Sequence, residues 1–208
     1  MLLERFHLLP RVGTYIDVGA GHPFRWSNTA RLYRKGWSGT LVEPDPTRAT
    51  LLKRFRRRDR VVQALVGVPT LTAAMSVYDD ANYNTVDRGL IAERAERGLR
   101  PVSEIIANSK TLSAIQSETA AQFGCPISLI CVDTEGSDLA VLKSGSWDVA
   151  RLRPLIVVAE ILDVADIRDL VDHPLIGFME SHDFVLTSRL KESVVLVDRA
   201  ACKGDHRQ

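Results

Sequence analysis

The sequence lacks any long hydrophobic run, and this excludes one class of protein. None of its segments approaches ~18 uncharged apolar residues, the length that a membrane-spanning helix needs. The N-terminal segment is partly apolar but short, and it carries Glu4, Arg5 and Arg11. Because it has neither a continuous apolar stretch nor a cleavage site of small residues, we do not interpret it as a signal peptide. We therefore predict a cytoplasmic protein with no membrane association.

Cysteine and histidine are also scarce. The chain has 3 cysteines, and neither their number nor their spacing fits a zinc site. Its 5 histidines are scattered, and no two of them have the spacing of metal ligands. The simplest interpretation is a protein with reduced thiols, as is usual in the cytosol.

The chain has little net charge, because 27 basic and 26 acidic residues give +1 at neutral pH. It therefore has no overall field that would attract nucleic acid or an anionic membrane. The one strongly basic stretch, residues 53–60, falls at the predicted end of a helix, where the helix dipole favours cations. We interpret it as a solvated helix end rather than as a nucleic-acid patch.

The length and the apolar content are those of an ordinary globular protein. The chain has 208 residues, of which 45% are apolar, enough for one domain with a large core. We predict a single domain over residues 1–208, with an N-terminal extension at 1–12 and a frayed tail at 203–208.

Short apolar runs alternate with amphipathic stretches, which is typical of βαβ units and a mostly parallel sheet. The predicted parallel strands are 14–18, 39–43, 60–66, 127–133 and 154–160. The predicted helices are 27–35, one that Asp45 caps and Pro46 begins, 110–123, 137–143, and 164–181 with a break near Pro174. The runs at 184–190 and 193–199 predict a C-terminal antiparallel hairpin.

The middle of the chain is less regular. Residues 72–78 predict a strand beside the third one, residues 84–98 predict a helix, and residues 102–107 are ambiguous. The whole pattern predicts an α/β fold with a doubly wound, mostly parallel sheet. Such a sheet binds its ligand outside the carboxyl ends of its strands, near the point where the strand order reverses.

Acidic residues stand at the carboxyl ends of four predicted strands: Asp17, Glu43, Asp133 and Glu160. In a parallel sheet these ends share one edge. Each acid alone could simply cap the helix that follows it. Four together favour a ligand that binds carboxylates, because buried acids are costly without a partner.

A glycine turn, Gly19-Ala20-Gly21, follows the first predicted strand. It could begin the dinucleotide fingerprint G-x-G-x-x-G, but Phe24 occupies the third glycine position. Glu43 can accept hydrogen bonds from the ribose of either a nicotinamide cofactor or S-adenosylmethionine. Asp17 favours the second, because a carboxylate suits the ammonium of a methionine moiety better than a phosphate.

The segment Asp133-Thr134-Glu135-Gly136 ends the fourth predicted parallel strand. Its two carboxylates could point into one cleft, where they could position a cofactor, act as a general base or hold a divalent cation. The alternative is that Glu135 only begins the next helix, where the helix dipole favours an acid.

Three segments of the sequence resemble the FkbM family of S-adenosylmethionine-dependent methyltransferases. They are YIDVGAGHPFRWSNTARLYRKGWSGTLVEPDP (Tyr15–Pro46), SLICVDTEGSDLAVLKSGSW (Ser128–Trp147) and RPLIVVAE (Arg153–Glu160). The resemblance implies a Rossmann-like class I methyltransferase fold and methyl transfer to a hydroxyl oxygen. The acceptors that it implies are sugars, glycans or secondary metabolites.

The resemblance also implies roles for individual residues. The cofactor would be held by Asp17, Gly19, Ala20, Gly21, Glu43 and Asp133, with Ala64 and Leu65 near the adenine. The acceptor would face Asp133, Glu135 and Glu160. We hypothesise that Asp133 or Glu135 is the base, or that a divalent metal assists, and that Glu160 orients the acceptor.

Two other functions stay open at this point. A nicotinamide-dependent oxidoreductase is disfavoured by Phe24. A methyltransferase-like module that binds the cofactor without catalysis is compatible with everything in the sequence.

Overall fold

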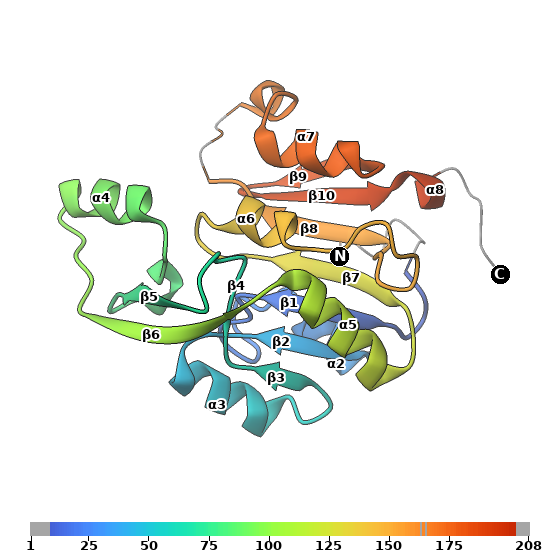
Figure 1. Cartoon of the computed structure of the whole chain (residues 1–208), viewed down its shortest axis with the longest axis horizontal. Helices are drawn as coiled ribbons and strands as arrows, with labels where there is room; N and C mark the ends of the chain where they lie inside the picture. Colours follow the sequence, from blue (N-terminus) through green and yellow to red (C-terminus); the bar gives the residue numbers. More distant parts are fainter. Residues whose placement is uncertain (1–8, 163, 165, 203–208) are drawn as a thin grey trace.

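A seven-stranded sheet forms the centre of the computed structural model, which describes residues 9–162, 164 and 166–202. The predicted tail at 203–208 and most of the predicted extension at 1–12 lie outside these residues. The strands are β1 (Thr14–Val18), β2 (Ser38–Val42), β3 (Arg60–Val62), β7 (Ile127–Val132), β8 (Ile156–Glu160), β9 (Phe184–Leu190) and β10 (Ser193–Asp198). Their order is β3-β2-β1-β7-β8-β10-β9 (Figure 1).

The first five of these strands are parallel, and β10 runs antiparallel to both β8 and β9. This confirms the predicted α/β fold with a mostly parallel sheet and a C-terminal hairpin. The strand order reverses beside β1, because the chain continues to β2 on one side and later returns to β7 on the other. A ligand crevice is therefore expected outside the carboxyl ends of β1 and β7.

Helices cover both faces of the sheet. Packed on one face are α5 (Leu112–Phe123), α6 (Asp138–Lys143) and α7 (Pro174–Ser181), where they share a core cluster with Ile16 and Val18 of β1. Packed on the other are α2 (Ala30–Arg34), α3 (Pro46–Phe55) and α8 (Arg199–Cys202), beside Tyr15. Alternate side chains of β1 thus enter two different cores.

Capping side chains begin the helices near the site. Oδ1 of Asp45 accepts hydrogen bonds from the backbone amides of Thr47 (2.7 Å) and Arg48 (3.3 Å), and Pro46 takes the first helical position, as predicted. The predicted helix 27–35 is shorter and begins at Ala30, whose amide donates to Oγ of Ser27 (3.2 Å). The predicted helix 164–181 is divided into η2 (Ile167–Leu170) and α7.

The third predicted strand, 60–66, is divided between two sheets. After β3 the chain leaves the main sheet, and β4 (Leu65–Val66) pairs with β6 (Ser103–Lys110). The strand predicted at 72–78 exists as β5 (Thr72–Val77), but its position beside the third strand was wrong, because β5 pairs with β6. A small core of its own, centred on Leu65, Met75 and Ala107, stabilises this second sheet.

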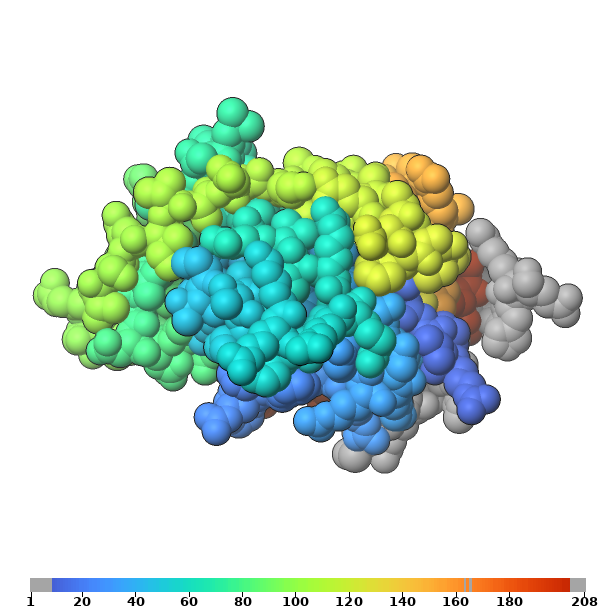
Figure 2. Space-filling model, turned by 90° about the horizontal axis from the view of Figure 1, so that it is seen from below, coloured from blue at the N-terminus to red at the C-terminus, as the bar shows by residue number. Residues whose placement is uncertain are grey.

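Between β5 and β6 lie η1 (Ala81–Tyr83) and α4 (Arg88–Glu96). The predicted helix 84–98 begins only at Arg88, because Thr85 is extended and bridges to Ser76. We call residues 65–110 the inserted segment. It projects beyond the end of the main sheet (Figure 1), and its green residues form the left end of the molecule in the view from below (Figure 2). Among the described residues, no helix has both the length and the apolar character to cross a membrane.

Candidate active site

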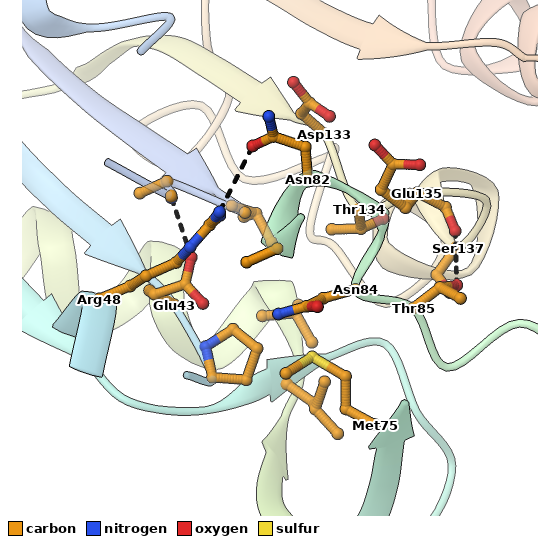
Figure 3. A pocket seen from close by; sticks show the side chains of 18 of the residues that line it. Glu43, Arg48, Met75, Asn82, Asn84, Thr85, Asp133, Thr134, Glu135 and Ser137 are labelled. Atoms are coloured by element: carbon orange, nitrogen blue, oxygen red, sulfur yellow. Dashed lines mark hydrogen bonds between the residues drawn. The ribbon is translucent and has the colours of Figure 1, made fainter. Parts of the chain in front are cut away.

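A cavity lies at the carboxyl edge of the sheet, between the strand ends and the inserted segment. Its empty volume is about 1020 Å³, which includes the open mouth. Nine of the ten predicted site residues line it: Gly19, Ala20, Gly21, Glu43, Ala64, Leu65, Asp133, Glu135 and Glu160. Figure 3 shows Glu43 and Arg48 on one wall and Asp133 and Glu135 on another.

The glycine turn after β1 is built for close backbone approach. Gly19 has φ +80°, and a Cβ atom there would lie 1.8 Å from the carbonyl oxygen of Asp133. The backbone amides of Gly19 and Ala20 both donate to the carbonyl of Val42, at 3.0 and 3.1 Å. Gly21 also has a positive φ, +58°. The turn therefore joins the ends of β1, β2 and β7 and leaves no room for a side chain at Gly19.

Glu43, at the end of β2, holds the far side of this turn. Its Oε2 accepts from the amide of Gly21 (2.8 Å), and its Oε1 accepts from the amide of Asp45 (2.9 Å). Burial raises the pKa of the carboxyl, while these two amides oppose the shift. Each carboxylate oxygen keeps a second lone pair for a ligand hydroxyl.

Asp17 is the one predicted site residue that does not line the cavity. It is 1% exposed, and its Oδ2 accepts from the hydroxyl of Thr29 (2.6 Å). Its Oδ1 is buried and has no hydrogen-bond partner among the described residues. Burial raises the pKa of Asp17 to about 7, although Thr29 and then Arg56 lower it.

This raised pKa predicts how stability depends on pH. Between about pH 4 and 7 the folded protein keeps the proton of Asp17 and the unfolded chain loses it, so this group lowers the stability as pH rises. The Asp17→Asn variant cannot titrate there. Relative to the native protein, we expect its free energy of unfolding to gain up to about 4 kcal/mol between pH 4 and 7.5.

Urea unfolding of both proteins across this range measures the difference. Burial also raises the pKa of Asp138, to about 6, so this group likewise lowers the stability as pH rises. Its contribution is the same in both proteins and cancels when one free energy of unfolding is subtracted from the other. A stability difference that stays constant with pH would contradict the assignment.

An apolar wall lies beside Glu43. Ala64 lies just before the inserted segment, Leu65 and Val66 begin that segment, and Met75 adds to the wall from β5. Asn82 and Asn84 follow nearby, and Nη2 of Arg48 donates to Oδ1 of Asn82 (3.4 Å). This end of the cavity can hold a flat, largely apolar ring with polar edges.

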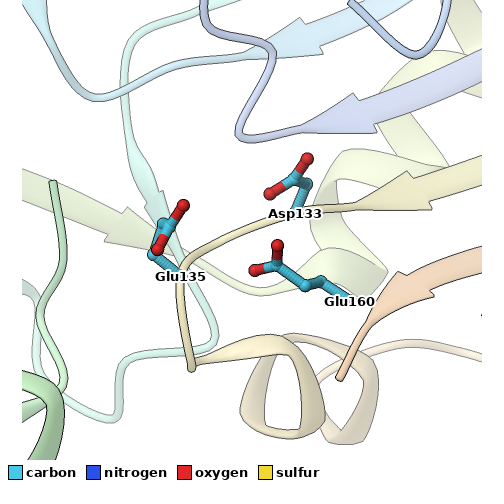
Figure 4. Close-up of side chains that lie close together, drawn as sticks. All are labelled: Asp133, Glu135 and Glu160. Atoms are coloured by element: carbon cyan, nitrogen blue, oxygen red, sulfur yellow. The ribbon is translucent and has the colours of Figure 1, made fainter. Parts of the chain in front are cut away.

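Three carboxylates converge at the other end of the cavity (Figure 4). One oxygen each of Asp133, Glu135 and Glu160 lies within 4.8 Å of the others. Burial, and after it the charge of Asp133, raises the pKa of Glu160 to about 9. Burial also raises the pKa values of Asp133 and Glu135. At neutral pH Glu160 therefore holds a proton, and it can donate a hydrogen bond.

Asp138 is a fourth carboxylate in this region, which the sequence interpretation missed. It is 4% exposed and begins α6, where its Oδ2 accepts from the hydroxyl of Thr134 (2.9 Å). Its Oδ1 accepts from the amide of Glu160 (3.2 Å). The acid that begins the helix is thus Asp138 and not Glu135, so Glu135 is left for the cavity.

The inserted segment holds Glu135 from outside the sheet. Nη2 of Arg94, in α4, forms an ion pair with Oε2 of Glu135 (2.6 Å), and its Nη1 donates to the carbonyl of Tyr83 (2.6 Å). The hydroxyl of Thr85 donates to the carbonyl of Glu135 (2.7 Å). Glu135 has φ +52°, a rare conformation for this residue type. Nothing in the local sequence around Arg94 indicated this long-range contact.

The basic stretch 53–60 is not simply a solvated helix end, because Arg56 is 0% exposed. Its guanidinium donates to Asp59 (2.8 Å), to the carbonyl of Pro23 (3.0 Å) and to the hydroxyls of Tyr15 (2.8 Å) and Thr29 (3.0 Å). The prediction failed for this one residue because periodicity alone does not show a buried polar partner. Through its hydrogen bond to the carbonyl of Pro23, Arg56 stabilises the loop that follows the glycine turn.

Comparisons with known proteins identify the family of this chain. The matching family model is described as the methyltransferase FkbM domain, and it covers residues 17–186. A comparison with curated protein sequences gives no match. Similar solved structures include a TehB-like SAM-dependent methyltransferase from Corynebacterium glutamicum, with 12% identity over 93% of this chain and 85% of that chain and a TM-score of 0.41.

Two further solved structures are also similar. The 1,6-didemethyltoxoflavin-N1-methyltransferase of Burkholderia thailandensis has 13% identity over 90% of this chain and 72% of that chain, with a TM-score of 0.44. A SAM-dependent methyltransferase from Aquifex aeolicus has 11% identity over 95% of this chain and 87% of that chain, with a TM-score of 0.40. The fold itself is α/β with a mostly parallel sheet. Because the family model spans most of the sequence, this chain belongs to the FkbM methyltransferase domain family.

Proposed function

We propose that this S-adenosylmethionine-dependent methyltransferase transfers the methyl group to a hydroxyl of a sugar, glycan or secondary metabolite. The observation that carries the proposal is the convergence of Asp133, Glu135 and Glu160 at one end of the cavity. Hydroxyls are weak nucleophiles at neutral pH and need a nearby base, whereas a cavity without titratable groups would suit a stronger nucleophile.

The residues at the other end of the cavity fit the cofactor. Gly19, Ala20 and Gly21 line the cavity without bulky side chains, the free lone pairs of Glu43 suit ribose hydroxyls, and Ala64 and Leu65 offer an apolar wall for the adenine. The orphaned Oδ1 of Asp17 lies directly before the turn but does not line the cavity, so a buried water is the partner that suits it. When bound, the cofactor supplies a methyl group on a positively charged sulfur.

Asp133 is the best placed of the three carboxylates to act as the base. Its only side-chain hydrogen bond among the described residues is a long one, from Nδ2 of Asn28 (3.4 Å). Glu135 is occupied by Arg94, and Glu160 already carries a proton at neutral pH. In this proposal Asp133 takes the proton of the acceptor hydroxyl, and Glu160 orients the acceptor by donating a hydrogen bond.

A divalent metal is the alternative way to activate the hydroxyl, because three carboxylates at this spacing are also a suitable oxygen ligand set. The two routes differ in one measurement. If Asp133 acts as a base, dialysis against a chelator leaves turnover unchanged. If the carboxylates hold a metal, dialysis removes turnover, and Mg²⁺ or Mn²⁺ restores it.

Isotope transfer tests the proposed function. The protein is incubated with trideuteromethyl-labelled S-adenosylmethionine and a panel of glycosides and hydroxylated small molecules, and products are identified by mass spectrometry. We expect a mass gain of one labelled methyl group on an oxygen. Label on nitrogen or carbon only would contradict O-methylation. Cofactor binding without label in any product would favour the non-catalytic module, and calorimetry with NAD tests the oxidoreductase alternative.

A further inference from the structure

Trp26 is the most exposed large apolar side chain in the part of the chain that the structure describes, at 90%. The other two tryptophans, Trp37 and Trp147, are each 2% exposed, and their indole NH groups donate to backbone carbonyls. Tryptophan is highly buried on average, so an indole in solvent calls for an explanation. Trp26 also lines the cavity, at the loop between β1 and α2.

The backbone at Trp26 is strained. Its φ is +55°, a left-handed conformation that bulky residues rarely adopt and that glycine or asparagine would adopt at lower cost. Strain of this kind persists where the surroundings impose it, and it gathers at functional sites. The strained residue gains little packing in return, because its side chain is 90% exposed.

The neighbouring residues fix this loop in place. Nδ1 of His22 accepts hydrogen bonds from the amides of Phe24 (3.1 Å) and Arg25 (3.0 Å). Nη1 of Arg56 donates to the carbonyl of Pro23 (3.0 Å) and to the hydroxyl of Ser27 (3.4 Å). Phe24 packs edge-on against Phe55. The residues on either side of Trp26 are therefore anchored, and the indole is presented to solvent by a defined loop.

The loop that carries Trp26 reaches the carboxylate end of the cavity two residues later. Asn28, two residues further on, donates to Oδ2 of Asp133 (3.4 Å). The apolar wall formed by Ala64 and Leu65 comes from the chain after β3, where the inserted segment begins. Trp26 lines the same cavity, and its loop contacts the carboxylate end, which is the space that the proposed function gives to the acceptor.

A cavity with both an exposed aromatic ring and several carboxylates offers a flat apolar surface and hydrogen-bond acceptors to the same ligand. The carboxylates of Asp133 and Glu135 accept hydrogen bonds from hydroxyls, and the indole offers a flat apolar surface. A sugar ring has the complementary features, with hydroxyls at its edges and an apolar face of C–H groups. We propose that Trp26 is the stacking platform for a sugar ring of the acceptor, an inference that rests on the proposed function and identifies its substrate class.

Binding measurements test this without any need for turnover. Methyl glycosides of glucose, mannose, galactose and rhamnose are titrated in the presence of S-adenosylhomocysteine, with tryptophan fluorescence and calorimetry as readouts. We expect at least one glycoside to bind and to shift the emission, because Trp26 is the exposed fluorophore. We expect W26G to weaken this binding at least about 10-fold, and W26F to retain most of it.

Two controls separate binding from folding. Glycine adopts φ +55° without strain, so W26G should keep the thermal midpoint of the native protein and its affinity for S-adenosylhomocysteine. The variant L71A removes another exposed side chain (89%), away from the cavity, and should leave glycoside binding unchanged.

Two results would each overturn the inference: equal glycoside binding in W26G and the native protein, or no binding of any glycoside. Glycoside binding through Trp26 without methyl transfer would instead refute the proposed function alone. Methyl transfer to a sugar at the same KM in W26G would keep the proposed function and refute the role of Trp26.

Discussion

Replacing Asp133 with asparagine is expected to lower kcat by about 10²- to 10⁴-fold, the contribution that general-base catalysis usually makes. Asparagine has the same size and can keep the contact with Asn28, but it cannot take a proton. The backbone carbonyl of Asp133 against Gly19 is unaffected. The affinity for S-adenosylmethionine, measured by calorimetry, should therefore change little, so that the loss appears in kcat.

The matched control is Glu135→Gln, because the amide oxygen of glutamine can still accept from Arg94. If Asp133 is the base, this variant loses much less activity than Asp133→Asn. The native rate should rise with pH through the raised pKa of Asp133, since only the deprotonated carboxylate accepts the proton. A kcat within about threefold of the native value in Asp133→Asn, or a larger loss in Glu135→Gln, would remove Asp133 from this role.

The parallel sheet and the position of the site were predictable from local patterns. Each parallel strand is a short apolar run, and the acids that follow the strands share one edge by topology alone. Asp45 and Pro46 start their helix as their capping chemistry requires. The glycines of the turn are needed for a backbone approach that any parallel sheet of this kind makes at its switch point. The part of the site that belongs to the main sheet could therefore be predicted from the local sequence.

The contacts of the inserted segment were not predictable in the same way. The ion pair of Arg94 with Glu135 joins residues 41 positions apart, and no periodicity reports it. The pairing of β5 with β6 likewise depends on where the chain turns after η1 and α4. Local patterns indicated that β5 is a strand, but its partner is set by tertiary packing.

Charge patterns misled in one place for a related reason. Seven of the eight residues at 53–60 are ionisable, and only burial distinguishes Arg56 from its neighbours. The signal that could have identified it is Asp59 three residues later, an acid inside a basic run. The ion pair of Arg56 with Asp59 has both side chains fully buried.

This pair gives the second large effect, which is on stability. Replacing Arg56 with methionine should lower the free energy of unfolding by about 3–5 kcal/mol, because it leaves the carboxylate of Asp59 buried without its charge partner. Methionine fills much of the same volume, so the loss reports mainly the polar contacts. The loop at Pro23 and Ser27 also loses its support, and the affinity for S-adenosylmethionine should fall as well.

Urea unfolding of three variants separates the causes. Arg57→Met changes an exposed neighbour in the same basic run and should stay within about 0.5 kcal/mol of the native protein. The double variant Arg56→Met with Asp59→Asn removes both charges, so it should recover part of the loss. If Arg56→Met and Arg57→Met were equally stable, the stretch would be a solvated helix end after all, and the loop that carries Trp26 would owe its conformation to other contacts.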